Sequence, residues 1–306
     1  MEYRTIGNSG LQVSIVGLGC NNFGRRLDAA ATKAVVSRCI ERGITFFDTA
    51  DVYGEGQSEQ FLGAALRGKR QDVVVATKFG GGDPPPGGSR RYMMRAVEDS
   101  LRRLGTDYID LYQLHVPDAR TPILETLRAM EDLVRQGKVR YVGHSNFSAA
   151  QATEAHYVAR YEHVTPFISA QNQWSLLSRT VEPELVTVCE RFGVGLLPYF
   201  PLASGLLTGK YRKGQPAPAG TRLADNQARE RWMTDGNLAM VEKLEGFAKQ
   251  RGHSLLELAI GWLASHPIVP SVIAGATKPE QVDANVAAAA WKLTQDELGE
   301  VDRLAR

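Results

Sequence analysis

Short apolar runs alternate with amphipathic stretches along the whole chain. The apolar runs are rich in Val, Ile, Leu, Phe and Tyr, a composition that favours buried strands. The candidate strands are residues 16–19, 44–47, 73–77, 108–114, 139–143, 167–170, 194–198 and 271–274. The pattern therefore predicts eight strands, each followed by sequence of helical character.

The amphipathic stretches have the period of an α-helix. In residues 92–104, apolar side chains recur at three- and four-residue spacing, at Met94, Val97, Leu101 and Leu104. This spacing places them on one face, which a crossover helix would pack against a sheet.

Local signals mark the ends of several helices. Thr121-Pro122 begins a predicted helix that Gly137 ends. A Ser or Thr followed three residues later by Gln or Glu has the spacing of a capping box. This spacing occurs at Ser148 and Gln151, at Ser254 and Glu257, and at Thr294 and Glu297, where it predicts a C-terminal helix.

The alternation indicates an α/β fold. Strands that alternate with helices run parallel, and eight such units close into a (β/α)8 TIM barrel with the helices outside. A length of 306 residues suits one large barrel or two smaller domains, and the unbroken alternation favours one domain over residues 1–306. A doubly wound sheet is the alternative. However, the segment Gly17-Leu18-Gly19-Cys20-Asn21-Asn22 lacks the third glycine of a dinucleotide-binding fingerprint.

Two long loops interrupt the alternation. Residues 80–89 form a Gly- and Pro-rich loop after the third strand, and residues 202–236 form a longer loop after the seventh. An additional helix over residues 237–250 follows, before the helix expected at Ser254. A long loop at a barrel mouth serves ligand binding or is disordered, and we favour ligand binding.

Composition excludes some function classes. A net charge of +2 without a basic cluster gives no reason to expect a nucleic acid or an anionic membrane as partner. The N-terminus has no apolar signal segment and no run is long enough to span a bilayer, so we expect a cytoplasmic protein. Cys20, Cys39 and Cys189 are widely spaced and odd in number, which favours buried free thiols over a disulfide framework.

Polar residues stand where successive strands end. In a parallel barrel all strand C-termini open onto one face, so residues at these ends converge. Five successive strands are followed by Asp48, Lys78, His115, His144-Ser145-Asn146 and Gln171-Asn172. Each has an ordinary explanation by itself, such as a helix cap for Asp48 or a solvated loop for Lys78. Their joint recurrence predicts a common site.

Several motifs resemble those of the aldo-keto reductases, in that family's order. They are D-T-A-D-V-Y-G (48–54), V-A-T-K (75–78), L-Y-Q-L-H (111–115), G-H-S-N-F (143–147), Q-N-Q-W-S-L-L (171–177), P-L-A-S-G-L-L-T-G-K-Y (201–211) and G-A-T-K-P-E-Q-V-D-A-N (275–285). The resemblance covers nearly the whole chain, and it is closer to the bacterial and potassium-channel β-subunit-like branch. It implies a barrel that binds NADP(H) at its mouth and reduces aldehydes or ketones.

The resemblance implies a proton-transfer site. Hydride transfer to a carbonyl carbon leaves an alkoxide, which needs a proton as it forms. Tyr53 would donate this proton, and Lys78 would lower the pKa of the phenol. Asp48 would pair with Lys78, and His115 would hydrogen-bond the substrate carbonyl. Asp51 is expected to be a solvent-facing or loop-capping residue.

The same resemblance implies the cofactor site. Residues expected at the nicotinamide are Ser145, Asn146 and Gln171 for the amide and Trp174 as a stacking face. Residues expected at the pyrophosphate are Tyr199, Pro201, Leu202, Ser204 and Lys210. Residues expected at the adenosine end are Arg222, Gly275, Thr277, Lys278, Gln281 and Asn285. Lys278 and a helix N-terminus suit a 2′-phosphate and favour NADPH over NADH, although Gln281 stands where many members have an arginine.

The substrate class and the alternatives also follow from this resemblance. A wall of Phe23, Tyr53, Phe79, Trp174 and Tyr199 or Phe200 would suit apolar or aromatic carbonyl compounds. A cofactor-binding regulatory protein with little turnover, like the channel β subunits, is the alternative. His115 favours the enzyme, because the channel β subunits have an asparagine at the corresponding position. A metal-dependent hydrolase is disfavoured because neither H-x-H nor H-E-x-x-H occurs, so we expect no metal.

Overall fold

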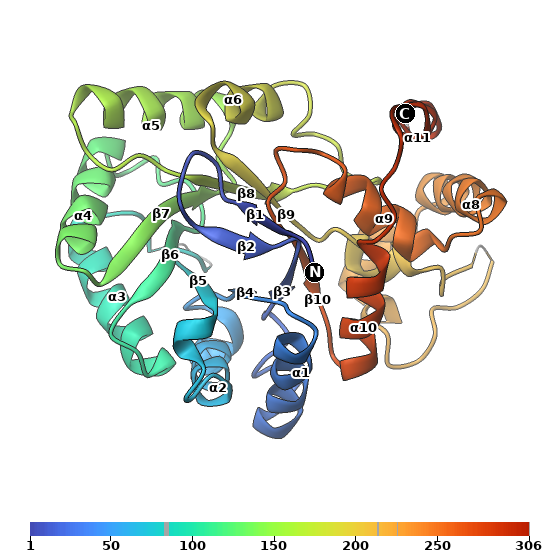
Figure 1. The fold of residues 1–306 in the computed structure, drawn as a ribbon, viewed down its shortest axis with the longest axis horizontal. Helices are drawn as coiled ribbons and strands as arrows, with labels where there is room; N and C mark the ends of the chain where they lie inside the picture. Colours follow the sequence, from blue (N-terminus) through green and yellow to red (C-terminus); the bar gives the residue numbers. More distant parts are fainter. Residues whose placement is uncertain (83–85, 213, 225, 306) are drawn as a thin grey trace.

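Eight parallel strands form a nearly closed barrel at the centre of the molecule (Figure 1). The computed structural model describes residues 1–82, 86–212, 214–224 and 226–305. The strands are β3 (Val16–Gly19), β4 (Phe46–Asp48), β5 (Val74–Phe79), β6 (Ile109–Leu114), β7 (Val139–Ser145), β8 (Ser169–Gln173), β9 (Gly195–Tyr199) and β10 (Val272–Gly275). From β3 to β9 each strand pairs with the next, and β10 pairs with β3. β9 and β10 are in contact but are not paired, which leaves the barrel nearly closed. The predicted (β/α)8 TIM barrel is confirmed.

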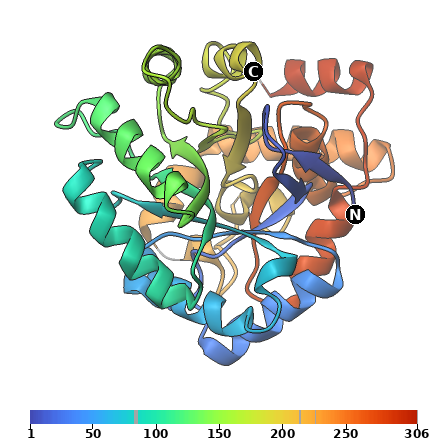
Figure 2. The ribbon, with the colours of Figure 1, turned by 60° about the vertical axis from the view of Figure 1, so that its left-hand side comes forward.

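The helices lie around the outside of this barrel (Figures 1 and 2). Those that connect the strands are α1 (Ala29–Glu41), α2 (Gln57–Ala65), α3 (Arg90–Leu104), α4 (Ile123–Arg135), α5 (Ala149–Tyr161), α6 (Leu185–Phe192) and α9 (Leu255–Ala264), and α10 (Pro279–Ala288) follows the last strand. The expected additional helix and C-terminal helix are present as α8 (Asp235–Gln250) and α11 (Gln295–Leu304). These two pack on each other at one side of the barrel.

The local helix signals are confirmed. Capping boxes with both reciprocal hydrogen bonds begin α5, α9 and α11, at Ser148, Ser254 and Thr294. Pro122 precedes α4, and Gly137, with φ of +73°, follows its C-terminal end. These contacts are made within a few residues, which is why the sequence could predict them.

The strands extend further toward their C-terminal ends than predicted. β4 includes Asp48, β5 includes Lys78 and β7 includes Ser145, and all three pair in register with the neighbouring strand. Sheet pairing uses the backbone, so a polar side chain does not end a strand when that side chain has its own partners. Asp48, Lys78 and Ser145 therefore stand on the strands themselves.

An N-terminal hairpin that the pattern analysis missed covers one end of the barrel. β1 (Tyr3–Thr5) and β2 (Gln12–Ser14) are antiparallel and lie in front of the central strands in Figure 1. Ile6 and Val13 are fully buried in a cluster with residues of five strands, namely Phe46, Ala76, Leu111, Leu197 and Ile273. Gly7 is required here, because a Cβ at this position would lie 2.4 Å from the Gly193 carbonyl oxygen. Strands of only three residues give too little alternation to be recognised.

The two long loops differ from the expectation in detail. The loop after β9 contains short helical turns, η3 (Ala203–Thr208), η4 (Arg222–Ala224) and α7 (Asn226–Trp232), before α8 begins. Of the loop at residues 80–89, positions 83–85 lie outside the described residues. Cys20, Cys39 and Cys189 are buried free thiols, as expected. Within the described residues, we find no helix both long and apolar enough to cross a membrane.

The packing of the hairpin yields a stability prediction. Ile6→Ala should lower the free energy of unfolding by about 2–5 kcal/mol, because it opens a cavity at the closed end of the barrel. Gln12→Ala, at an exposed position of the same hairpin, should change it by less than about 0.5 kcal/mol. Denaturant unfolding measures both values. Equal values for the two variants would show that the hairpin does not close the barrel core.

Candidate active site

A cavity of about 780 Å³ lies at the C-terminal ends of the strands, opposite the hairpin. It runs from the ends of β4 and β6 to the first turn of α10. Of the residues predicted from the sequence, those that line it are Asp48, Tyr53, His115, Ser145, Asn146, Gln171, Tyr199, Pro201, Leu202, Ser204, Lys210, Arg222, Gly275, Thr277, Lys278, Gln281 and Asn285. The structure thus brings together residues from most of the chain.

A buried ion pair lies under one end of this cavity. Lys78 is fully buried, and its Nζ donates to Asp48 Oδ2 at 2.6 Å and to the Thr49 carbonyl at 2.8 Å. Asp48 Oδ1 accepts from Gln171 Nε2 at 2.8 Å and from Gln113 Nε2 at 3.4 Å. Gln113 was not singled out in the sequence, although it lies two residues before His115 and so on the same side of β6. These contacts offset the cost of burying both charges.

Tyr53 lies beside this pair, in the turn η1 (Tyr53–Gly56) that follows β4. The Lys78 Nζ is 5.2 Å from the centre of the Tyr53 ring. Burial raises the pKa of Tyr53, and the opposing charge of Lys78 does not overcome this effect. The sequence predicted that Lys78 would lower the pKa of Tyr53. The net pKa is instead raised, because burial destabilises the phenolate more than the attraction of the Lys78 ammonium stabilises it. Tyr53 is held in its protonated, proton-donating form.

Lys78 keeps its charge in the same environment. Burial by itself lowers the pKa of Lys78, but the attraction of Asp48 and the interaction with Tyr53 outweigh it and the net pKa is raised. A protonated lysine and a protonated tyrosine therefore stand together. Proton loss from Tyr53 during a reaction would leave a phenolate that Lys78 stabilises.

His115 is the second polar group at this end. Its ring lies edge-on to Tyr53, with centroids 5.8 Å apart. Burial, and then the charge of Lys78, lower the pKa of His115 to about 3, so the imidazole is neutral. Its Nδ1 is buried without a hydrogen-bond partner among the described residues, and a Cβ at Gly81 would lie 2.4 Å from it. An unpaired lone pair costs less than an unpaired N–H, so this packing favours the tautomer with the proton on Nε2.

The residues expected around a nicotinamide amide are fixed by one another. Ser145 Oγ donates to the Gln171 carbonyl at 2.8 Å, and Asn146 Nδ2 donates to the His115 carbonyl at 2.9 Å. The Tyr199 hydroxyl donates to Asn146 Oδ1 at 2.7 Å. Asn146 has a φ of +61°, in the left-handed region that asparagine adopts more readily than most residues other than glycine.

The structure does not bring Trp174 to the cavity. Trp174 is 1% exposed, its Nε1 donates to Glu182 at 2.9 Å, and its ring packs against Trp262 and His266. Trp174 follows the end of β8 and is not among the residues that line the cavity, so it does not offer the expected stacking face there. Tyr199 is an aromatic residue that does line the cavity.

The aromatic wall is also smaller than expected. Phe23 and Phe79 are fully buried in the core, and Phe79 stacks on Tyr112 with centroids 4.7 Å apart. Of the predicted aromatic residues, Tyr53, Tyr199 and Phe200 line the cavity.

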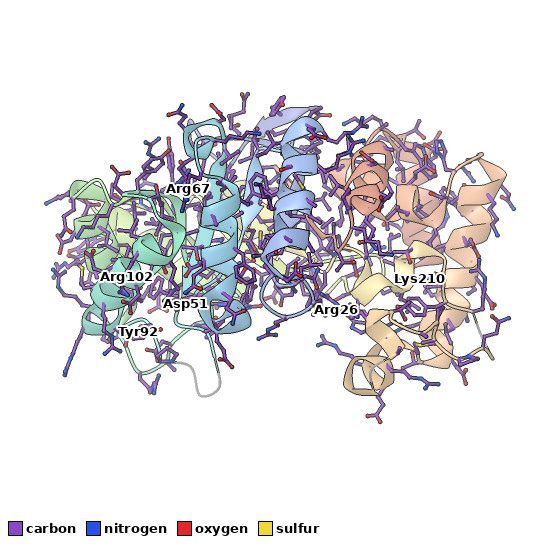
Figure 3. The ribbon with its side chains drawn as sticks, turned by 90° about the horizontal axis from the view of Figure 1, so that it is seen from below. Arg26, Asp51, Arg67, Tyr92, Arg102 and Lys210 are labelled. Atoms are coloured by element: carbon purple, nitrogen blue, oxygen red, sulfur yellow. The ribbon has the colours of Figure 1, made fainter. Side chains whose placement is uncertain are left out.

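The other half of the cavity is cationic. Lys210, Arg222 and Lys278 line it together with Arg26, which the sequence analysis did not select. Figure 3 shows Arg26 and Lys210 on separate parts of the chain. Burial, and then the charge of Arg26, lower the pKa of Arg222. The only carboxylate among the described lining residues is Asp48, which Lys78 neutralises, so this half would attract an anion with several charges.

Arg26 could have been found by position. It follows β3, in the loop that must open onto the same face as the other strand ends, and its Nη2 donates to the Gly220 carbonyl at 3.4 Å. Asn22 was also missed, and it accepts from Arg222 Nη2 at 2.8 Å. Two cations held by neutral groups are typical of an anion site.

At the far end, Gln281 holds the loop before α10. The backbone N–H and the hydroxyl of Thr277 donate to Gln281 Oε1, at 2.7 and 3.1 Å. Lys278 is the N-cap residue of α10 and is exposed. Gln281 therefore shapes this end of the cavity, and Lys278 supplies the charge.

Comparison with known proteins agrees with the fold. Residues 15–306 match the model of the Aldo/keto reductase family. The chain is 43% identical to a "Probable voltage-gated potassium channel subunit beta" of Oryza sativa subsp. japonica, over 94% of this chain and 91% of the relative. It is 34% identical to a "Probable aldo-keto reductase 1" of Glycine max (97% and 86%) and 34% identical to an "L-glyceraldehyde 3-phosphate reductase" of Escherichia coli O157:H7 (99% and 92%).

The environment of His115 predicts its behaviour on titration. The His115 ring resonances should not move between pH 5 and 8, because a pKa of about 3 keeps the imidazole neutral. In Lys78→Met the pKa should rise, since one of its two depressing influences is removed. Histidine NMR measures this, with assignment by loss of the signal in His115→Gln. An inflection between pH 5 and 8 in the unmodified protein would contradict the neutral assignment.

Proposed function

Because the chain belongs to the aldo/keto reductase family, we propose that it is an NADPH-dependent oxidoreductase that reduces aldehydes or ketones to alcohols. The observation that carries this proposal is the arrangement of four groups at one end of the cavity. A protonated Tyr53 and a neutral His115 line the cavity above the buried pair of Lys78 and Asp48. This is a proton donor and a hydrogen-bond donor beside a fixed positive charge.

The residues divide the work of reduction between them. Bound NADPH supplies the hydride that the carbonyl carbon accepts. His115, through Nε2–H, orients the carbonyl oxygen and stabilises the negative charge that develops on it. Tyr53 transfers its hydroxyl proton to that oxygen and becomes a phenolate, which the Lys78 ammonium stabilises. Asp48 touches neither substrate nor reacting atom, and it holds Lys78 in position.

The cavity residues fit the cofactor. The family generally uses NAD(P)H. Ser145, Asn146 and Gln171 offer amide and hydroxyl groups near the reactive end, and Tyr199 offers a ring face. The four cations of the other half suit the pyrophosphate and a 2′-phosphate. We propose NADPH over NADH because Lys278 and the first turn of α10 stand at the far end of the cavity.

A second function is favoured by the similarity to a channel β subunit. In this alternative the protein binds the cofactor and acts through a partner, with little turnover. His115 supports the enzyme, because a neutral imidazole facing the cavity serves carbonyl reduction and has no evident use in cofactor binding alone. Measurement of carbonyl-dependent NADPH oxidation separates the two functions.

Removal of the Tyr53 hydroxyl should abolish most of the activity. We expect purified protein to oxidise NADPH with 4-nitrobenzaldehyde, and Tyr53→Phe to lower kcat by about 10²- to 10⁴-fold, the range of general acid catalysis. The NADPH dissociation constant should stay within about twofold. Tyr161→Phe, at a residue 82% exposed, is the matched control. A fully active Tyr53→Phe would refute the proposed acid, and no turnover by the unmodified protein would favour the alternative function.

Removal of the Lys278 charge should weaken NADPH binding selectively. We expect Lys278→Ala to raise the NADPH dissociation constant about fivefold and to leave that of NADH unchanged, since an exposed ion pair is worth up to about 1 kcal/mol. Fluorescence titration measures both. Lys243→Ala, at an exposed position of α8, is the control. Equal affinities of the unmodified protein for NADPH and NADH would contradict the proposal that Lys278 binds the 2′-phosphate.

A further inference from the structure

A buried polar cluster lies behind Tyr53, outside the barrel. The side chain of Asp51 reaches toward α3, where its Oδ2 accepts from the Tyr92 hydroxyl at 3.2 Å (Figure 3). Its Oδ1 is buried without a hydrogen-bond partner among the described residues. Neither residue is among those that line the cavity. Asp51 is therefore only partly exposed and hydrogen-bonds a side chain of another element, which corrects the expectation of a solvent-facing residue.

The backbone around Tyr53 needs support from its neighbours. Gly54, Glu55 and Gly56 have φ of +56°, +57° and +87°, so three successive residues lie in the left-handed region. This is costly for Glu55, and such strain persists only where the surroundings impose it. A Cβ on Gly54 would lie 2.8 Å from the Phe23 carbonyl oxygen. The turn is thus clamped on one side by the loop after β3.

Helix α3 provides the clamp on the other side. A Cβ on Gly56 would lie 2.8 Å from Arg103 Cδ, and Arg103 Nε donates to Glu59 at 2.6 Å. Tyr92 and Arg103 are eleven positions apart, close to three helical turns, so both stand on the face of α3 that meets the turn. The Asp51–Tyr92 hydrogen bond is a direct link between the Tyr53 turn and this face.

The same helix also begins near glycines that pack against His115 and against each other. A Cβ on Gly81 would lie 2.4 Å from His115 Nδ1, and a Cβ on Gly80 would lie 2.8 Å from the carbonyl oxygen of Gly87, two residues before the N-cap residue Ser89. Tyr92 lies in the first turn of α3. The hydrogen bond between Asp51 and Tyr92 therefore joins the backbone that carries Tyr53 to the helix that begins beside these glycines.

The charged and titratable groups that face Asp51 come from three elements. Glu59 of α2 repels its carboxylate, Arg103 of α3 attracts it, and Tyr92 of α3 hydrogen-bonds it. The hydroxyl of Tyr112, on β6, is buried without a hydrogen-bond partner among the described residues. The negative charge of Asp51 contributes to raising the pKa of Tyr112. Burial, and then Glu59, raise the pKa of Asp51 to about 6. Since this pKa lies above the ordinary value, Asp51 is protonated below about pH 6 and ionised above it.

We propose that Asp51 is a positioning residue, whose ionised form holds the Tyr53 turn against α3 through Tyr92. A hydrogen bond to a carboxylate is roughly twice as strong as one to a neutral acid. The link therefore strengthens as Asp51 ionises and weakens in acid. The proposal rests on the proposed function, because it acts through Tyr53 as the proton donor.

The test is the dependence of kcat on pH, with saturating NADPH and 4-nitrobenzaldehyde. In the unmodified protein, kcat should fall on the acid side with a midpoint near pH 6. Asp51→Asn and Tyr92→Phe should each lower kcat at pH 7.5 by about fivefold and remove the acid limb, since a hydrogen bond is worth about 1 kcal/mol. The double variant should be no slower than the single ones, because both remove the same link. NADPH dissociation constants should not change, since neither residue lines the cavity.

Controls separate this role from general damage to the fold. Tyr157→Phe, at a residue 49% exposed, should keep both the rate and the acid limb. Circular dichroism at pH 5.5 and 7.5 establishes that each variant is folded at both ends of the profile. An acid limb that persists in folded Asp51→Asn, or additive losses in the double variant, would overturn the positioning role. Absence of turnover in the unmodified protein would instead overturn the proposed reductase.

Discussion

The buried ion pair of Lys78 and Asp48 is the interaction on which the rest of the site depends. A lysine with no exposed surface costs several kcal/mol unless its charge is compensated, and here a carboxylate at 2.6 Å and a backbone carbonyl compensate it. Asp48 in turn needs the amide of Gln171, which comes from β8. The pair therefore requires β4, β5 and β8 in correct register. Once formed, the pair holds the positive charge of Lys78 in place, and this charge acts on the pKa values of Tyr53 and His115.

The barrel provides this register. Along each of these strands, the apolar core residues and the polar site residues lie at different levels. Phe46 and Ala76 lie two residues before Asp48 and Lys78, so the same strand faces carry an apolar layer below and the ion pair above. The N-terminal hairpin covers the apolar layer, and the cavity lies at the other end of the strands. Burial removes hydration that would stabilise a phenolate at Tyr53, and the attraction of Lys78 does not make up for this loss. This explains why Tyr53 stays protonated beside a lysine.

The cavity has two unlike halves, and their charges suit different tasks. One half holds the neutral side chains of Tyr53 and His115 over a compensated ion pair, and in the proposed reaction they would stabilise charge that develops on a substrate oxygen. The other half holds cations such as Arg222 whose described partners are neutral, which suits a ligand with several negative charges. Outside the barrel, α3 braces the strained turn that carries Tyr53. The position of Tyr53 and the charge beside it are thus set from opposite sides of the sheet.

The sequence by itself determined the features that depend on local order. Eight alternating units predicted the barrel, the capping boxes predicted helix starts, and polar residues at successive strand ends predicted that Asp48, Lys78 and His115 meet. Only the tertiary structure decided what surrounds each group. It placed Trp174 in the core, added Arg26 to the cavity lining and brought Asp51 into a hydrogen bond with Tyr92. It also reversed the net pKa shift of Tyr53. These outcomes depend on burial by residues far apart in the chain, which local spacing does not encode.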